Sequence, residues 1–177
     1  MNFTFKINKS SIYIKNIYCP IDINNIESYL KRIEETKKDQ KKKIELILIP
    51  NTNLISISHL NWAIFISKNR FEEGMNISKD LWKEVMVTLN MSDQVHRLST
   101  SWHLKNGINK EVFFILVSES KLTAAEVKKI TNNLGIKEIK AKEKAIPFQK
   151  EEAKKFYKVE EPNAEEKIIE KMATAIL

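Results

Sequence analysis

Short stretches of the chain alternate apolar and polar residues, which is the two-residue period of a β-strand with one buried face. Phe3, Phe5 and Ile7 form the first of these stretches. The run from Val112 to Val117 is apolar throughout, which is typical of a strand that is covered on both faces or lies in the middle of a sheet. The sequence predicts strands at residues 3–7, 12–17, 44–49 and 112–117, and an edge strand at residues 136–141.

Other stretches space their apolar residues by three and four, which gives a helix one buried stripe. Between Asn51 and Gly107 the pattern predicts three successive helices, and the first is apolar almost all round, so it should be central. Leu30 belongs to the stripe of the first helix in the chain, and Trp82 shares a face with Leu81, Val85 and Leu89. The predicted helices begin at or after Asn24 or Asn25, Ser58, Ser78, Ser92, Thr123 and Asn163, and Gly74, Gly107 and Gly135 end three of them.

Two of these helix starts have the pattern of a capping box, in which a side chain at the N-cap and an acid three residues later exchange hydrogen bonds with the backbone. Thr123 with Glu126 forms one, and Asn163 with Glu166 repeats the pattern. The second predicts a C-terminal helix over residues 163–177.

These elements predict an α+β fold. We expect a small mixed β-sheet packed with a cluster of helices, in a single domain that covers residues 1–177. Three glycines are too few for a loop-rich all-β protein. No internal repeat is visible.

The charge of the chain favours an anionic partner, but only weakly. Thirty Lys and Arg against 23 Asp and Glu give a formal net charge of +7 and a pI near 9.3. Net charge affects solubility and the electrostatic steering of charged partners, but it does not identify a specific binding site. A Lys-rich composition with solvated faces explains the same numbers.

Cys19 is the only cysteine, so the chain cannot form an internal disulfide or a Cys-based metal site. The amino end lacks the basic head and long apolar stretch of a signal peptide. No apolar run approaches the ~20 residues of a membrane span. We therefore expect a cytoplasmic protein that has no contact with membranes.

Catalytic constellations are not apparent in the sequence. His96 and His103 would lie two helical turns apart, about 10 Å, which is too far for one metal ion. The isolated glycines do not form a phosphate-binding loop. The paired carboxylates lie in charge-rich segments that should be solvated. We expect a protein that is not an enzyme and that has no cofactor.

The stretch from Asn53 to Gly107 resembles a known family. It contains His59-Leu60 followed by Ala63-Ile64, then Ser78 to Glu84 with an aromatic before the acid. Asp93-Gln94-Val95 and Lys105-Asn106-Gly107 come next. In this order and spacing the stretch resembles the kinase-binding regulatory subunit of the KEOPS (EKC) complex, the PRPK-binding protein family. The capped terminal helix from Glu165 to Leu177 is also similar to the last helix of that family.

The resemblance implies a non-catalytic role in tRNA modification. The complex places threonylcarbamoyl on the adenosine next to the anticodon of tRNAs that read codons beginning with A. In that family this subunit binds the atypical kinase and regulates its ATPase activity, and in archaea it helps to hold the 3′ CCA end of tRNA. The other KEOPS subunits would be indirect partners.

The terminal helix is the expected kinase-binding surface, because it has too many apolar residues for a stripe buried on one side only. The alternative is that all of them pack inside the protein. These residues are Ile168, Ile169, Met172, Ala173, Ile176 and Leu177.

The central helices supply candidates for holding the tRNA end, since single-stranded nucleotides bind cationic groups and open helix ends. A solvated helix surface is the competing interpretation. The candidates are His59, Lys68, Arg70, Ser92, Gln94, Arg97 and Lys105, and the lysines at 41 to 43 are a third possible contact, for phosphates of the tRNA body. A general RNA-binding protein and an interaction scaffold unrelated to the kinase are the alternative functions.

Overall fold

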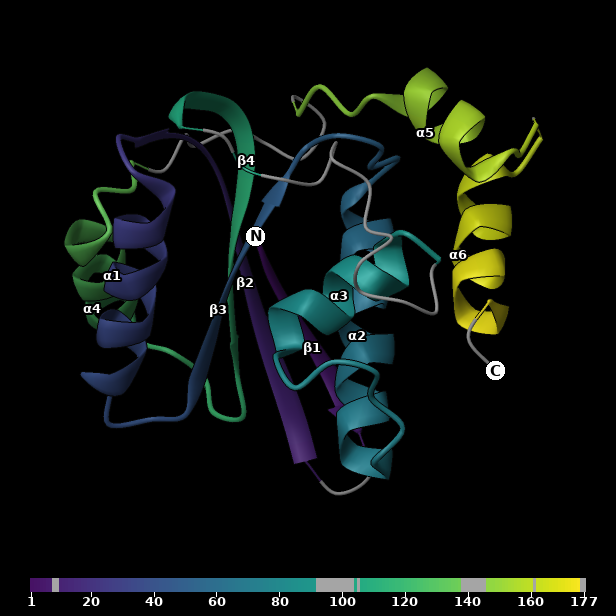
Figure 1. The fold of residues 1–177 in the computed structure, drawn as a ribbon. Coiled ribbons are helices and arrows are strands. Elements are labelled where there is room, and N and C mark those ends of the chain that lie inside the picture. Colours follow the sequence, from purple (N-terminus) through teal and green to yellow (C-terminus); the bar gives the residue numbers. More distant parts are fainter. Residues whose placement is uncertain (8–9, 92–103, 105, 138–145, 161, 176–177) are drawn as a thin grey trace. The chain divides into compact units, whose positions relative to one another are not determined.

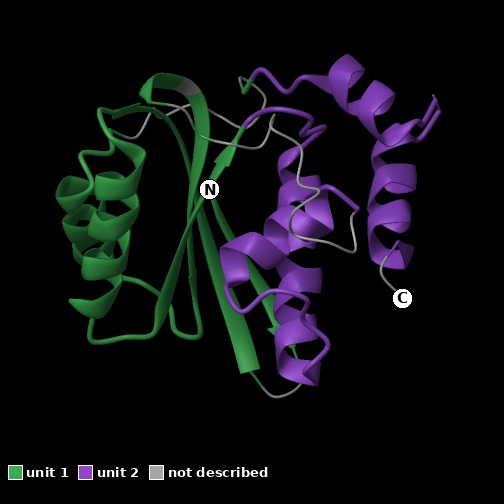
Figure 2. Ribbon diagram, in the orientation of Figure 1, with its two compact units in different colours: residues 1–50, 103–146 green, residues 51–102, 147–177 purple. Residues whose placement is uncertain are grey.

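The computed structural model describes residues 1–7, 10–91, 104, 106–137, 146–160 and 162–175. The chain divides into two compact units, each made of two segments that are far apart in the sequence (Figure 2). Unit 1 contains residues 1–50 and 103–146, and unit 2 contains residues 51–102 and 147–177. Helices and strands in the described residues confirm the α+β class. The single domain over residues 1–177 stays a prediction.

The described strands of unit 1 form one sheet in the order β1-β2-β4-β3. Its strands are β1 (Asn2–Ile7), β2 (Ser10–Ile23), β3 (Ile44–Pro50) and β4 (Gly107–Ser118). β4 pairs with both β2 and β3, so it lies in the middle, as its apolar run predicts. All described pairings are antiparallel, which differs from the predicted mixed sheet. Alternation shows which residues face inward, but it does not show in which direction the neighbouring strand runs.

β2 continues well beyond the predicted strand at residues 12–17 and ends at Ile23. Its register with β4 shifts between Cys19 and Ile21, on either side of Pro20. Since proline has no N–H to donate to a neighbouring strand, an irregularity at this residue lets the strand continue past it.

Two helices of unit 1, α1 (Ile26–Lys38) and α4 (Ala124–Asn133), lie side by side on one face of the sheet (Figure 1). Buried residues of both helices and of the strands form one apolar cluster. The hydroxyl of Tyr29 donates to the carbonyl of Leu134 at 3.2 Å, which joins the two helices. The assignment of Leu30 to the buried stripe is wrong, because its side chain is 43% exposed. Tyr29 and Ile33 face the sheet instead.

Unit 2 is helical in its described part. It contains α2 (Ile57–Glu73), α3 (Leu81–Leu89), α5 (Lys150–Tyr157) and α6 (Ala164–Thr174). The C-terminal helix is therefore confirmed, up to the last described residues. The sequence does not predict α5, because this short helix buries only Ala153 and Tyr157, which is too few for a visible stripe.

Several predicted helix ends are confirmed. Asn25 caps α1 by accepting from the N–H of Ser28 at 2.9 Å. Thr123 and Glu126 form the predicted capping box of α4. Gly74 ends α2 in the left-handed conformation, with φ of 71°. The helix that Gly107 was predicted to end lies outside the described residues, and β4 begins at Gly107.

Two predicted helix starts are wrong by two residues each, and a third is right in position but lacks its predicted capping box. Ser56, not Ser58, caps α2, and it accepts from the N–H of His59 at 3.0 Å. α3 begins after Asp80 and not after Ser78. Asn163 is the N-cap of α6, but its side chain makes no capping hydrogen bond and its φ is 65°. The capping box with Glu166 is therefore absent, because a left-handed N-cap does not hold the side chain in the usual position.

The helix predicted after Ser92 and most of the edge strand predicted at residues 136–141 lie outside the described residues. None of the described helices is long enough and apolar enough to cross a membrane.

Candidate functional site

The C-terminal helix α6 is held in unit 2 by polar contacts at both of its ends. At its start, the hydroxyl of Ser56 donates to a carboxylate oxygen of Glu165 at 2.6 Å. Further along, the ammonium of Lys171 donates to the carbonyls of Tyr157 and Lys158, each at 3.1 Å. These carbonyls lie at the end of α5. Lys171 therefore satisfies backbone acceptors that the end of a helix leaves open.

Only part of the apolar stripe of α6 is buried in unit 2. Ala164, Ile168 and Met172 follow one another at intervals of four residues and are buried. Ile169 is half-buried and Ala173 is exposed. Since successive residues of a helix differ by about 100°, Ile169 and Ala173 lie on one flank of the buried line. We call these two residues the α6 flank.

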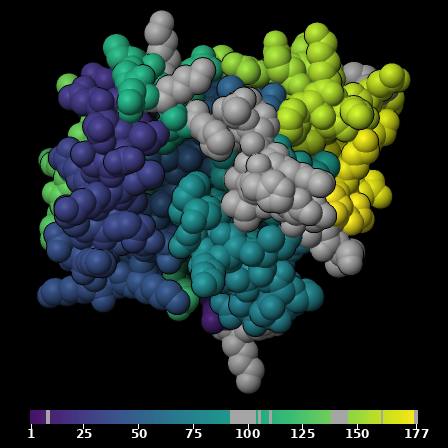
Figure 3. All heavy atoms as spheres, viewed as in Figure 1, coloured from purple at the N-terminus to yellow at the C-terminus, as the bar shows by residue number. Residues whose placement is uncertain are grey.

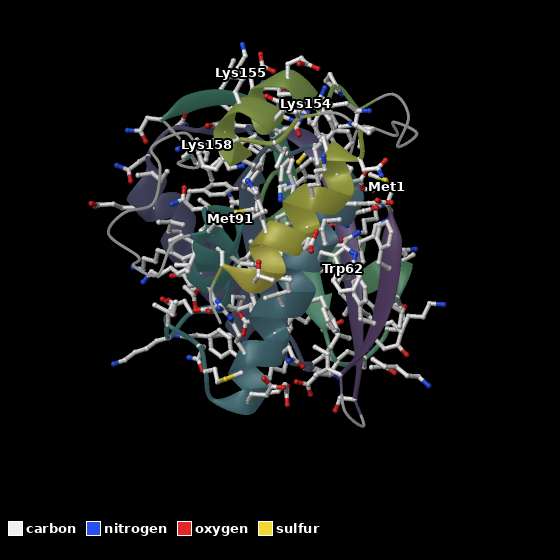
Figure 4. The ribbon with its side chains drawn as sticks, turned by 90° about the vertical axis from the view of Figure 1, so that its right-hand side faces the viewer. Met1, Trp62, Met91, Lys154, Lys155 and Lys158 are labelled. Atoms are coloured by element: carbon white, nitrogen blue, oxygen red, sulfur yellow. The ribbon has the colours of Figure 1, made fainter. Side chains whose placement is uncertain are left out.

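The predicted kinase-binding residues are therefore divided. Ile168 and Met172 are completely buried in the described structure, so they are core residues of unit 2. Ile169 and Ala173 remain accessible. Ile176 and Leu177 lie outside the described residues. Figure 4 looks onto α6 and labels Lys154, Lys155 and Lys158, which come from α5 and the residue that follows it.

Tyr157 of α5 connects α6 to the rest of unit 2. Its hydroxyl donates to the carbonyl of Leu89 at 2.6 Å, at the end of α3. Its ring meets the ring of His59 edge to face, with centroids 5.2 Å apart. Burial raises the pKa of Tyr157 above its ordinary value, so it stays a neutral donor.

His59, the first predicted tRNA-binding residue, is completely buried. Neither of its ring nitrogens has a hydrogen-bond partner among the described residues. Burial lowers its pKa to about 3, so the ring is neutral at physiological pH. A neutral side chain without exposed surface does not form a contact with tRNA phosphates. The sequence placed it correctly in α2 but could not show that α5 covers this face.

Arg70, another predicted tRNA-binding residue, is also buried. Its guanidinium donates to a carboxylate oxygen of Glu84 at 3.1 Å. The other oxygen of Glu84 accepts from the N–H groups of Ile77 and Ser78, at 3.0 Å and 2.8 Å. Glu84 has no exposed surface. The pair fixes the loop between α2 and α3, so the structure assigns Arg70 a structural role instead of the predicted one.

Of the other predicted tRNA-binding residues, the structure describes only Lys68. It is partly buried, and its ammonium lies 3.8 Å from Glu72. Ser92, Gln94, Arg97 and Lys105 lie outside the described residues. Of the seven predicted residues, the described part of the chain therefore contains three, and two of these, His59 and Arg70, are buried.

The loop between α2 and α3 and the start of α3 carry exposed apolar side chains that the sequence did not single out. Met75 is 56% exposed, Ile77 38% and Trp82 37%. Trp82 was predicted to share a face with Leu81, Val85 and Leu89, but these three residues are buried and Trp82 is not. The only sequence signal was that Trp82 is offset from the line of Leu81, Val85 and Leu89.

The described residues contain no group of three or more His, Cys, Asp or Glu side chains that could hold a metal ion. No protein-family model matches the chain, and a search of curated proteins finds no match.

Proposed function

We propose that this chain is a non-catalytic, cytoplasmic subunit of the KEOPS complex. It would bind the atypical kinase subunit directly, regulate its ATPase activity and contact the remaining subunits indirectly. It would also help to hold the 3′ CCA end of tRNA during threonylcarbamoyladenosine synthesis. The support for this proposal is the order of residues from Asn53 to Gly107 together with the α6 flank.

The observation that carries the proposal is the apolar stripe of α6, which is wider than the part that unit 2 buries. Ile168 and Met172 are completely buried and pack in the core of unit 2. Ile169 and Ala173 continue the apolar surface on one flank of this buried line. An accessible apolar line on a helix fits the groove of a protein partner better than it fits a nucleic acid.

The structure changes the experiment that tests kinase binding. Truncation after Lys167 would remove Ile168 and Met172 from the core, so a loss of binding would not distinguish a docking role from unfolding. The double variant Ile169→Glu/Ala173→Glu places two charges on the α6 flank and leaves the core intact. A matched control, Lys167→Glu/Thr174→Glu, changes two exposed residues on the opposite side of the same helix.

Calorimetric titration of the purified atypical kinase measures the outcome. We expect the flank variant to lose about 100-fold in affinity, because charges in the buried centre of an interface typically cost several kcal/mol. The control variant should stay within about threefold, since rim charges contribute little. Unchanged affinity of a folded flank variant would refute the proposed kinase contact.

The tRNA contact has a separate test. Binding of the whole chain to intact tRNA is compared with binding to tRNA from which the CCA end has been trimmed. We expect weaker binding of the trimmed tRNA and weaker binding of both at higher salt. Equal affinities for the intact and the trimmed tRNA would show that the chain does not bind the CCA end, and they would not affect the proposed kinase contact.

A further inference from the structure

The corner of unit 1 between the end of α1 and the start of β3 has a high density of lysine. A shallow depression of about 300 Å³ lies at this corner. Five lysines and two glutamates are among its lining residues. Figure 3 shows this segment, in blue, on the surface of unit 1.

Two of the five lysines are held by carboxylates. The ammonium of Lys37 lies 2.8 Å from Glu45 of β3 and 3.3 Å from Glu34 of α1. Burial opposes the charge of Lys37, but these two glutamates outweigh it and raise its pKa above the ordinary value. Both glutamates that line the depression are therefore occupied by Lys37.

Lys42 is held by a different element. Its ammonium lies 2.8 Å from Glu126, in the first turn of α4, and donates to the carbonyl of Lys121 at 3.2 Å. The hydrogen bonds from Lys42 and Thr123 lower the pKa of Glu126 to about 2, so the carboxylate stays ionised. Lys37 and Lys42 together fix the corner to β3 and α4.

The remaining three lysines, Lys38, Lys41 and Lys43, are exposed, and the described residues provide no ion pair for any of them. We call these three residues the lysine corner. Lys121 is also exposed, and its backbone carbonyl accepts from Lys42. The unpaired positive charge is thus concentrated at one place on a fixed surface.

The chemistry of the depression indicates what it binds. None of its nine lining residues, all of them described, is aromatic, so it offers no surface for the stacking of single-stranded bases. The one apolar residue that lines the depression, Ile44, is buried, so the depression offers no exposed apolar side chain that could insert into a membrane. Lysine acts on phosphate as a point charge and does not read base edges.

We propose that the lysine corner binds the phosphodiester backbone of a nucleic-acid duplex. Together with the proposed function, this duplex is a helical arm in the body of tRNA, away from the CCA end. Only the assignment to RNA, and to tRNA in particular, rests on the proposed function. The contact would be independent of sequence and sensitive to salt.

The test compares two triple variants of the full chain. Lys38→Gln/Lys41→Gln/Lys43→Gln removes the lysine corner. Lys6→Gln/Lys31→Gln/Lys137→Gln removes three other exposed lysines of unit 1 and the same total charge. The probes are an RNA duplex of about 16 base pairs with no tRNA features and a tRNA without its CCA end. Neither the kinase nor the CCA end is present, so failure of the proposed function does not affect the result.

The readout is the slope of the logarithm of the binding constant against the logarithm of salt concentration. Removing three phosphate contacts should lower this slope by about 2 to 3 for both probes, because each contact contributes about 0.9. The control triple should change it by less than about 1. Equal changes in the two variants would mean that only net charge matters, and the proposal would be wrong.

A second probe separates nucleic-acid phosphates from lipid phosphates. Vesicles of phosphatidylcholine and phosphatidylserine present the same anionic groups on a membrane. We expect no effect of the lysine-corner variant on vesicle sedimentation. If the variant lost vesicle binding but kept duplex binding, the duplex assignment would be overturned.

Discussion

At the scale of single residues, the ion pair between Arg70 and Glu84 is the most heavily constrained group in unit 2. Glu84 is completely buried and binds one guanidinium and two backbone N–H groups. Taking such a carboxylate out of water is costly, and its partners compensate for that cost only as a complete set. Its role is to fix the loop that displays Ile77.

We predict that Glu84→Gln lowers the free energy of unfolding by about 3 kcal/mol or more, because it removes the buried carboxylate charge that the guanidinium of Arg70 contacts. The exposed Glu73 provides the matched control, and Glu73→Gln should change stability by less than about 0.5 kcal/mol. Urea unfolding measures both. Similar losses in the two variants would contradict the structural role of the pair.

His59 makes the stability of unit 2 depend on pH. Its ordinary pKa is 6.5 and burial lowers it to about 3. The unfolded chain therefore takes up a proton near pH 6.5, whereas the folded chain does so only near pH 3. Stability from this residue is fully present above pH 6.5 and is lost as the pH falls toward 3, by up to about 1.4 kcal/mol per unit.

The variant His59→Phe keeps an aromatic ring against Tyr157 and removes the titration. Between about pH 7.5 and about pH 5, we predict that the wild type loses more stability than the variant, by on the order of 1 to 2 kcal/mol. The urea midpoints of both proteins at the two pH values measure this difference. The contributions of all other titrating groups cancel when the wild type is compared with the variant, because both proteins contain them. Parallel pH profiles would show that His59 is solvated or paired.

At the scale of elements, α6 combines a core residue and a surface residue at adjacent positions. Ile168 is completely buried and Ile169 is only half-buried. We predict that Ile168→Ala lowers the free energy of unfolding by about 2 to 5 kcal/mol, because it leaves a cavity. Ile169→Ala should cost about 1 kcal/mol or less. Urea unfolding of the two variants compares them, and equal losses would mean that the α6 flank is part of the core.

The two predicted capping boxes show how far local sequence determines an element. In α4 the box forms, because Thr123 has extended backbone and its hydroxyl reaches the N–H of Glu126 at 3.2 Å. In α6 the same pattern fails, because Asn163 is left-handed and its side chain makes no capping hydrogen bond. The backbone conformation of the N-cap residue decided the outcome, and it is not visible in four residues of sequence.

At the scale of the whole molecule, net charge and the distribution of charge carry different information. The value of +7 is fixed by composition. The folded chain neutralises some lysines, such as Lys37 and Lys42, and leaves Lys38, Lys41 and Lys43 without ion pairs among the described residues. The side of unit 1 that attracts an anion depends on which lysines are paired with carboxylates and not on the total net charge.

The division into two units is also a property of the folded chain. Each unit joins an early segment to a late one, such as residues 1–50 with 103–146. Helices and strands have the same local periodicity in either unit, so the pattern predicts the elements but not how they are grouped. The assignment of a mixed sheet failed for the same reason.

The sequence by itself determined which segments form most of the helices and strands, that β4 is central and that α6 is amphipathic, because these depend on the spacing of neighbouring residues. Only the tertiary structure decided which polar residues are exposed. His59 and Arg70 became core residues because Tyr157 and Glu84, from other helices, cover or neutralise them. Ile169 and Lys38 stayed accessible because no described segment covers them completely. Burial depends on residues that are distant in sequence, so it emerges only when the chain has folded.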